Sequence, residues 1–237
     1  MRYIHITAGL IALIAGAIAL YSAKGGAMHR KSGTGFVLAM WTMTLSAAIM
    51  AGLLRPNRLN FVAALTTFYL VSTAWLAVKR TLAQSRGWHV ALLLLALSTS
   101  AYAFSLAAQA ANSANGRIDG MPPQPLYMFA LVCALGAALD ARLLLAGSIE
   151  GAHRIARHLW RMGLAMWIGT ASFFLGQAKF FPQSIRKSGL LAIPVLLLAL
   201  YILWSLVRVL KARRARAGAS AYRPDARDGQ RASGESA

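Results

Sequence analysis

The sequence predicts an all-α membrane protein, a polytopic bundle of seven transmembrane helices, and three observations support this fold class. Hydrophobic residues make up 58% of the 237 residues and charged residues only 13%, which is too apolar for an ordinary soluble domain. The apolar residues form runs of about twenty, the length that a helix needs to cross a hydrocarbon core about 30 Å thick. These runs are continuous rather than alternating, which favours helices over a membrane β-barrel.

Seven apolar runs follow one another along the chain. The first run begins after a single Arg2 and is longer than the core of a signal peptide, so we interpret it as a retained span. Pro, Gly, Asn or basic residues separate the later runs, and the longest polar loop, residues 111–125, divides the chain nearly in half. The expected spans are residues 3–23, 34–54, 61–78, 88–111, 125–147, 159–178 and 188–208.

Lys and Arg residues are distributed unequally between the two ends of these spans. Of the 25 Lys and Arg residues, one end holds eighteen, ten between Lys24 and Arg161 and eight between Arg208 and Arg231, and the other end holds seven. Because cytoplasmic loops carry the excess of Lys and Arg, the N-terminus is expected outside and the C-terminus in the cytoplasm. Membrane topology thereby accounts for the net charge of +19, so the lipid bilayer is the expected partner and no nucleic-acid partner is expected.

Residues 151–167 resemble a second copy of residues 26–41. Both segments begin with Gly-Ala, continue with His-Arg and end with Leu-Ala-Met-Trp. Further pairs follow in the same order, with offsets that grow from 124 to 129 residues, as two units that diverged by small loop insertions would show. The pairs are His29 and His153, Trp41 and Trp167, Pro56 and Pro182, and Trp75 and Trp204.

This internal similarity predicts a parallel repeat of three plus one plus three helices. Residues 1–80 are the first three-helix repeat, residues 81–124 a linker made of the fourth helix and an external loop, and residues 125–210 the second repeat. Residues 211–237 are rich in Arg, Ala, Ser and Gly. They are expected to form a disordered, basic cytoplasmic tail close to anionic lipid.

Four of the five histidines, His29, His89, His153 and His158, fall on the predicted cytoplasmic side. Imidazole ligates haem iron and other transition metals and exchanges protons near neutral pH. A membrane haem b needs two histidines from different helices at one depth, and three of these residues stand at expected helix starts on one side. The sequence therefore predicts a cofactor site for haem b or a metal. The alternative is that each histidine caps a helix end or contacts lipid headgroups.

Arg154, Arg157 and Arg161 surround His158 at helical spacing. Together with Arg30 they predict an anion-binding site for a propionate, a phosphate or a lipid headgroup. Plain anchoring of cations at the cytoplasmic surface accounts for most of the four without any ligand.

Asp140 is the only acidic residue expected within a span. A carboxylate at that depth is costly unless it is paired or functional. Arg157 and Arg161 on the next long helix are the expected partners. Two roles stay open at this point, a structural ion pair and a proton relay.

Several chemistries lack the residues that they need. Cys133 is the only cysteine, so an internal disulfide or a thiolate metal cluster cannot form. The last span contains no lysine for a retinal Schiff base, and the chain has no Walker motif, HExxH motif or serine-nucleophile pattern. No catalytic residue is assigned, and the only enzyme class retained is a membrane redox protein.

Two groups of residues form recognisable motifs. The first is the early His5, followed by Gly9, Gly16, Lys24-Gly25 and then His29-Arg30 with Gly33. The second is RHLWRM at residues 157–162 and SFFLGQ at residues 172–177, followed by Pro182. As a set they resemble an uncharacterised family of bacterial multi-helix membrane proteins. The resemblance implies a bacterial inner-membrane location and assigns no activity.

Three functional hypotheses follow. The leading one is an electron-transfer protein that holds haem b or a metal through the cytoplasmic-side histidines and exchanges electrons with a quinone or another redox partner. The alternative is a small-solute transporter, motivated by the parallel repeat and Asp140. The third is a non-catalytic membrane scaffold. The sequence makes no prediction of the oligomeric state.

Overall fold

The structure, a computed structural model, describes residues 1–221 of the chain and the side chains of residues 1–212. Within that part every regular element is a helix, and the only β-type contact is an isolated bridge between Ile118 and Met121. The predicted all-α class is confirmed.

Helices of twenty residues or more dominate the described chain. Three short helical segments, η2 (Ala178–Phe180), α7 (Gln183–Lys187) and η3 (Leu190–Ala192), connect the last two long helices. A π-helical turn, η1 (Met50–Leu54), extends the second. The long helices are α1 (Arg2–Tyr21), α2 (Ala27–Ile49), α3 (Arg58–Lys79), α4 (Leu82–Ala111), α5 (Gln124–Ala146), α6 (Gly151–Phe174) and α8 (Ile193–Ala221).

Some helices begin well before the apolar runs that predicted them. The helix α6 begins at Gly151 rather than near residue 159, and α2 begins at Ala27 rather than near residue 34. Hydropathy detects only the apolar part of a helix, whereas the basic turns before each run are helical as well. The helix α8 continues to Ala221, so the first part of the predicted disordered tail is helical. Residues 222–237 of that predicted tail lie outside the described residues.

Six helices of the described chain are long and apolar enough to cross a membrane, which supports a multi-pass membrane protein. They are α1, α2 with η1, α3, α4, α5 and the helix formed by η3 and α8 as far as Ala212. The exception is α6, whose first half carries Arg154, Arg157 and Arg161. The count of seven spans therefore stays a prediction.

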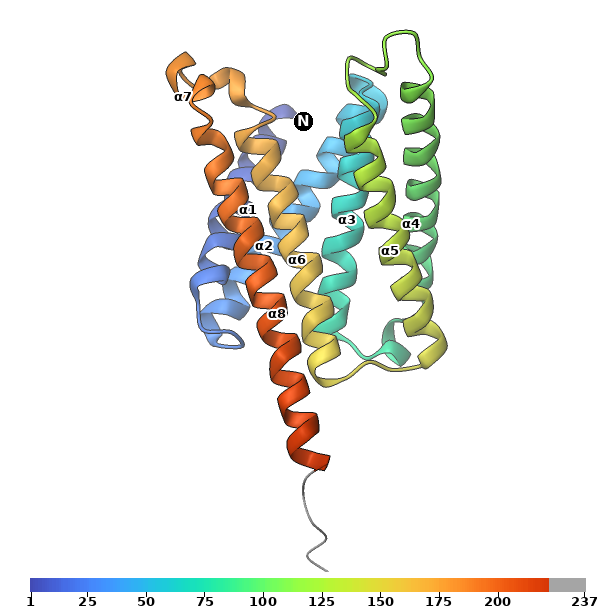
Figure 1. Cartoon of the computed structure of the whole chain (residues 1–237), viewed down its shortest axis with the longest axis vertical. Helices are drawn as coiled ribbons and strands as arrows, with labels where there is room; N and C mark the ends of the chain where they lie inside the picture. Colours follow the sequence, from blue (N-terminus) through green and yellow to red (C-terminus); the bar gives the residue numbers. More distant parts are fainter. Residues whose placement is uncertain (222–237) are drawn as a thin grey trace, which may run out of the picture.

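All the long helices run along one common direction (Figure 1). The N-terminus, the loop at residues 112–123 and α7 lie at one end of the bundle. The turns at residues 22–26, 80–81 and 147–150 lie at the other, where α8 also leaves the bundle. We call this second end the basic end, because Lys24 and Arg80 lie in its turns. Which end faces the cytoplasm stays a prediction.

The helix α3 forms the centre of the bundle. It packs against α2, α4, α5 and α6, and Val62, Tyr69 and Leu70 on it are fully buried. The helix pairs α1 with α2, α4 with α5, and α6 with α8 surround it. The outward faces are rich in exposed leucine, as on α8 at Leu196 and Leu200. Apolar faces of this extent suit contact with lipid rather than water.

The two predicted repeats correspond to α1–α3 and to α5, α6 and α8, with α4 between them. Trp41 and Trp167 occupy matching places, and each donates its indole N–H to the next helix, to Ser72 Oγ at 3.0 Å and to Val195 O at 3.2 Å. The first pair of each unit differs, because α1 packs closely along α2 whereas α5 packs mainly along α4. The duplication stays a prediction.

Candidate functional site

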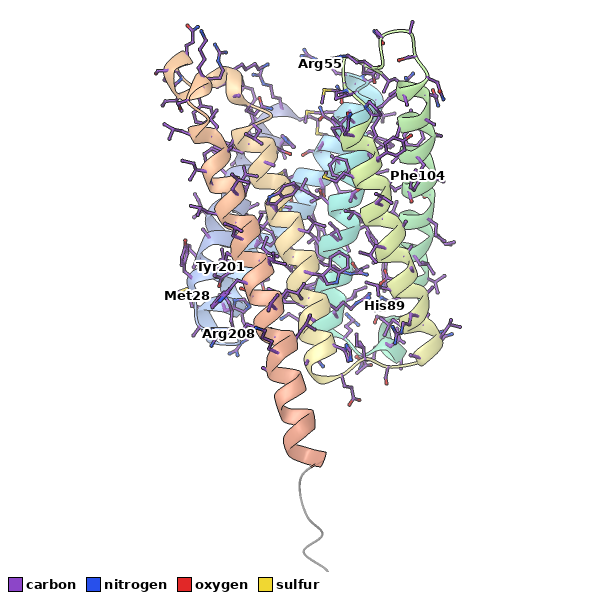
Figure 2. The ribbon with its side chains drawn as sticks, in the orientation of Figure 1. Met28, Arg55, His89, Phe104, Tyr201 and Arg208 are labelled. Carbon is purple, nitrogen blue, oxygen red and sulfur yellow. The ribbon has the colours of Figure 1, made fainter. Side chains whose placement is uncertain are left out.

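The four predicted histidines do not form one site. His89 is buried on α4, His29 and His158 are half-buried on α2 and α6, and His153 is exposed. No group of three or more His, Cys, Asp or Glu side chains suited to a metal ion occurs in the part of the chain that the structure describes. Figure 2 shows Met28, the neighbour of His29, on the opposite flank of the bundle from His89.

His153, which the sequence repeat pairs with His29, does not share its surroundings. His153 lies in the exposed first turn of α6, because this helix begins at Gly151. Five residues along an α-helix turn a side chain by about 140°, so His153 and His158 point in different directions. The half-buried environment of His29 therefore finds its counterpart at His158.

His29 and His158 share one arrangement of hydrogen bonds. The Nδ1 atom of His29 lies 2.9 Å from the carbonyl oxygen of Ala19 on α1, and Nδ1 of His158 lies 3.1 Å from that of Ala74 on α3. A carbonyl oxygen can only accept, so in each neutral ring Nδ1 carries the proton and Nε2 keeps its lone pair. Nε2 of neither ring has a hydrogen-bond partner among the described residues.

The helices that carry the two rings, α2 and α6, approach each other at α1. Phe36, two turns beyond His29, and Met166, two turns beyond His158, meet at Gly16 of α1. A Cβ atom at Gly16 would lie 2.9 Å from the Phe36 ring and 3.1 Å from Met166 Sδ. Apolar groups therefore close the inner side of this histidine pair, and the turns of the basic end lie on its outer side.

A second cluster surrounds Asp140, which is fully buried on α5. Arg161 of α6 reaches both carboxylate oxygens, with Nη2 2.6 Å from Oδ1 and Nη1 3.2 Å from Oδ2. Nη1 of Arg157 lies 2.6 Å from Oδ1, and the hydroxyl of Tyr69 on α3 donates to Oδ2 at 2.6 Å. Asp140 thus joins three helices, and both arginines that the sequence offered as partners bind it.

Helical spacing brings these groups together. Arg157 and Arg161 are four residues apart and lie on one face of α6, as Gly136 and Asp140 do on α5. Nη2 of Arg161 also donates to the carbonyl of Gly136 at 3.1 Å. A Cβ atom at this glycine would lie 2.6 Å from the Tyr69 hydroxyl oxygen, so the absence of a side chain makes room for the tyrosine.

The Asp140 cluster contains more positive than negative charge. Two guanidinium groups face one carboxylate, and Arg157 and Arg161 are 5% and 0% exposed. Nε and Nη2 of Arg157 and Nε of Arg161 have no hydrogen-bond partner among the described residues, and neither has Nδ1 of the nearby His89. The ring faces of Tyr69 and Trp160 lie 5.2 and 4.9 Å from the Arg161 guanidinium and offset part of its charge.

A cavity of about 130 Å³ lies at the basic end, beside His89. Figure 2 places His89 near that end, on the flank formed by α4 and α5. The walls come from the turns before α4 and α6 and from apolar residues of α3 and α5. They are formed by Ala77, Arg80, Thr81, Leu82, His89, Leu143, Ser148, Ile149, Glu150 and Arg154.

The four predicted anion-binding arginines are separated into three places. Arg30 is exposed and donates to the carbonyl of Gly25, Arg154 lines the cavity, and Arg157 and Arg161 bind Asp140. The structure therefore does not bring the four arginines together, and their binding of an anion stays a prediction. Anchoring at the membrane surface also fails to account for Arg157 and Arg161, because both are buried.

Sequence reasoning did not find Tyr69 or Gly136. Tyr69 stands in an apolar run with three other aromatic residues, and nothing in the sequence shows that its hydroxyl group meets Asp140. Gly136 does carry a signal, because it precedes Asp140 by one helical turn and is the only glycine of its helix. A glycine one turn from a buried charge indicates that another group approaches the backbone closely.

Comparison with family models, with curated proteins and with solved structures found no match for the chain, so the resemblance suggested by the motifs stays an expectation.

Proposed function

We propose that the protein is a membrane electron-transfer protein that binds haem b, which His29 and His158 would hold. The main support for this proposal is that the two rings have the same hydrogen-bond geometry. Each Nδ1 is engaged by a backbone carbonyl of a neighbouring helix, and each Nε2 keeps a free lone pair. Metal-binding histidines in proteins have this second hydrogen bond, which fixes the tautomer and the ring orientation and makes the ligand nitrogen more basic.

The surrounding residues suit this group. Haem supplies one-electron redox chemistry when it is bound through two histidines. Ala19 and Ala74 would orient the ligand rings through their carbonyls. Phe36 and Met166 would exclude water from the inner side. The ammonium of Lys24 in the nearby turn donates to the carbonyls of Ala19 and Leu20 and holds the end of α1 beside His29. Electron exchange with a quinone or another redox partner belongs to the same proposal.

A visible absorption spectrum of the purified protein in detergent tests the proposal. We expect a Soret band in the wild type that is lost in His29→Gly and in His158→Gly. Added imidazole should restore the band in both variants, because it can fill the space left by the ring and supply the missing nitrogen. His153→Gly is the matched control, since it removes an exposed histidine of α6, and its spectrum should not change.

Two results would overturn the assignment. A wild-type protein without a Soret band, after expression with added haem precursor, would remove the haem proposal. Equal loss of the band in His153→Gly would remove the ligand assignment. Reduction of the bound haem by a short-chain quinol would support the quinone partner, and reduction by dithionite alone would speak against it.

The transporter alternative has less support. A proton relay requires Asp140 to release its partners during each cycle, whereas this carboxylate accepts hydrogen bonds from Arg161 and Tyr69 and contacts Arg157. The ion-pair role fits these contacts better. If the spectrum shows no haem, the hypothesis of a non-catalytic membrane scaffold is the one that is left.

A further inference from the structure

The cavity beside His89 carries an inference that is independent of haem. His89 is only 3% exposed and forms part of the cavity wall, and neither of its ring nitrogens has a hydrogen-bond partner among the described residues. Burial of a polar side chain without a partner is unfavourable. A ring of this kind in the wall of a cavity favours a polar occupant of the cavity.

The charges around the cavity favour an anion. Arg80 and Arg154 stand in its wall against one acidic residue, Glu150. Behind His89 lies the Asp140 cluster, and the charges of Arg157 and Arg161 act on the His89 ring together with that of Asp140. These three residues add one further positive charge, so cations outnumber carboxylates both in the wall and behind it.

One long helix also begins at the cavity. Glu150 is the N-cap of α6 and lines the wall, whereas the start of α4 is closed by the capping box of Thr81 and Gln84, and this helix departs from helical geometry at Ser85. The first turn of a helix presents free backbone N–H groups and the positive end of its dipole. The side chain of Glu150 makes no capping hydrogen bond, so it leaves the first N–H groups of α6 to another acceptor. The uncapped start of α6 at the cavity reinforces the preference for a negative group.

The size of the cavity suits a small ion. Its volume is about 130 Å³, whereas one water molecule needs only about 10–15 Å³ of such space. Hydroxyl groups of Thr81 and Ser148 in the wall are additional donors. An occupant with several oxygen atoms could therefore bind His89, Arg154 and the hydroxyls together.

We propose that this cavity is a binding site for a phosphate group, held by His89 and Arg154 and stabilised by the excess positive charge around Asp140. Inorganic phosphate and the phosphate of a lipid headgroup offer the same chemistry. The cavity lies at the end of the bundle, at the level of the helix starts, where either can reach it.

The test uses the full-length protein in detergent free of phospholipid. Thermal unfolding is measured against increasing inorganic phosphate, and in parallel against short-chain phosphatidic acid. Binding to the native state should raise the midpoint with concentration. In Arg154→Gln we expect the affinity for whichever of these two ligands binds the wild type to fall about tenfold or more, because a hydrogen bond to a charged group is lost. His89→Gln should show a loss of the same kind.

Arg30→Gln is the matched control. Arg30 is the counterpart of Arg154 in the other copy of the motif, is equally exposed, and lies far from the cavity wall in sequence. Its variant should bind as the wild type does. Stabilisation by phosphate itself identifies a free ion, and stabilisation by the lipid alone identifies a headgroup. Absence of both effects, or equal loss in Arg30→Gln and Arg154→Gln, would overturn the site.

Discussion

The helices α2 and α6 begin with the same residue types, Gly-Ala followed by His-Arg, and end the shared segment with Leu-Ala-Met-Trp. Their cations nevertheless lie in different environments. Arg30 and Lys31 of α2 are exposed at the basic end, whereas Arg157 and Arg161 of α6 are buried. The offset of 126 residues, which aligns Trp41 with Trp167, places Arg157 opposite Lys31 and Arg161 opposite Gly35 of α2. A cation at the same position is therefore exposed in one unit and buried in the other, where Asp140 pairs with it.

The neighbours of each helix follow this difference. Small residues let α1 approach α2 closely, and Gly35 of α2 meets Ala15 of α1 with only ordinary contact for an added Cβ atom. The helices α5 and α6 make little backbone contact, and the side chains of Arg157, Arg161 and Asp140 connect them instead. Close backbone packing joins α1 to α2 in the first unit, whereas ion pairs join α5 to α6 in the second. Substitutions that remove a charge from these contacts should therefore lower the free energy of unfolding more than substitutions that remove a charge elsewhere in the molecule.

The largest effect is expected for Asp140→Asn. The substitution leaves two buried guanidinium groups without a counter-charge, and breaking a buried ion pair in this way costs about 3–5 kcal/mol. Chemical unfolding of the purified protein in detergent measures the loss. The matched control is Asp119→Asn, because Asp119 is exposed and lies 4.0 Å from Arg58. That pair should contribute at most about 1 kcal/mol, and equal losses in both variants would contradict the buried cluster.

The two arginines should differ from each other. Arg161 makes two contacts with Asp140 and one with the Gly136 carbonyl, whereas Arg157 makes one contact and leaves Nε and Nη2 without partners. Arg161→Met should cost about 3 kcal/mol or more, since it removes the principal counter-charge. Arg157→Met removes the excess charge and still leaves one ion pair, so it should cost less than about 1 kcal/mol. The same unfolding measurement decides between them, and a larger loss for Arg157→Met would contradict this account of the charge balance.

Composition and run length were sufficient to predict an all-α membrane bundle, because hydrocarbon imposes helices and fixes their length. The partners of Asp140 could also be predicted, since the chain offers few cations near its depth. The separation of His153 from His158 could not, because it depends on the helix α6 beginning at Gly151 rather than at the apolar run. Only when residues 151–158 are helical is the direction of His153 about the helix axis fixed relative to that of His158. Tyr69 was missed for a similar reason, since its partner lies 71 residues away.

The smallest expected change in stability comes from substituting a glycine in each unit, Gly136 on α5 and Gly33 on α2. Gly136→Ala places a Cβ atom 2.6 Å from the Tyr69 hydroxyl oxygen and 2.7 Å from its ring, and overpacking of this kind costs about 1–3 kcal/mol. Gly33→Ala on α2 meets nothing within 4 Å. Because alanine is the better helix former, it should stabilise the protein by up to about 1 kcal/mol. Changes of the same sign in the two variants would show that the charge cluster does not depend on close approach at Gly136. If Gly136→Ala lowers the stability and Gly33→Ala raises it, the unit that contains Asp140 depends on close packing at the contact between Tyr69 and α5.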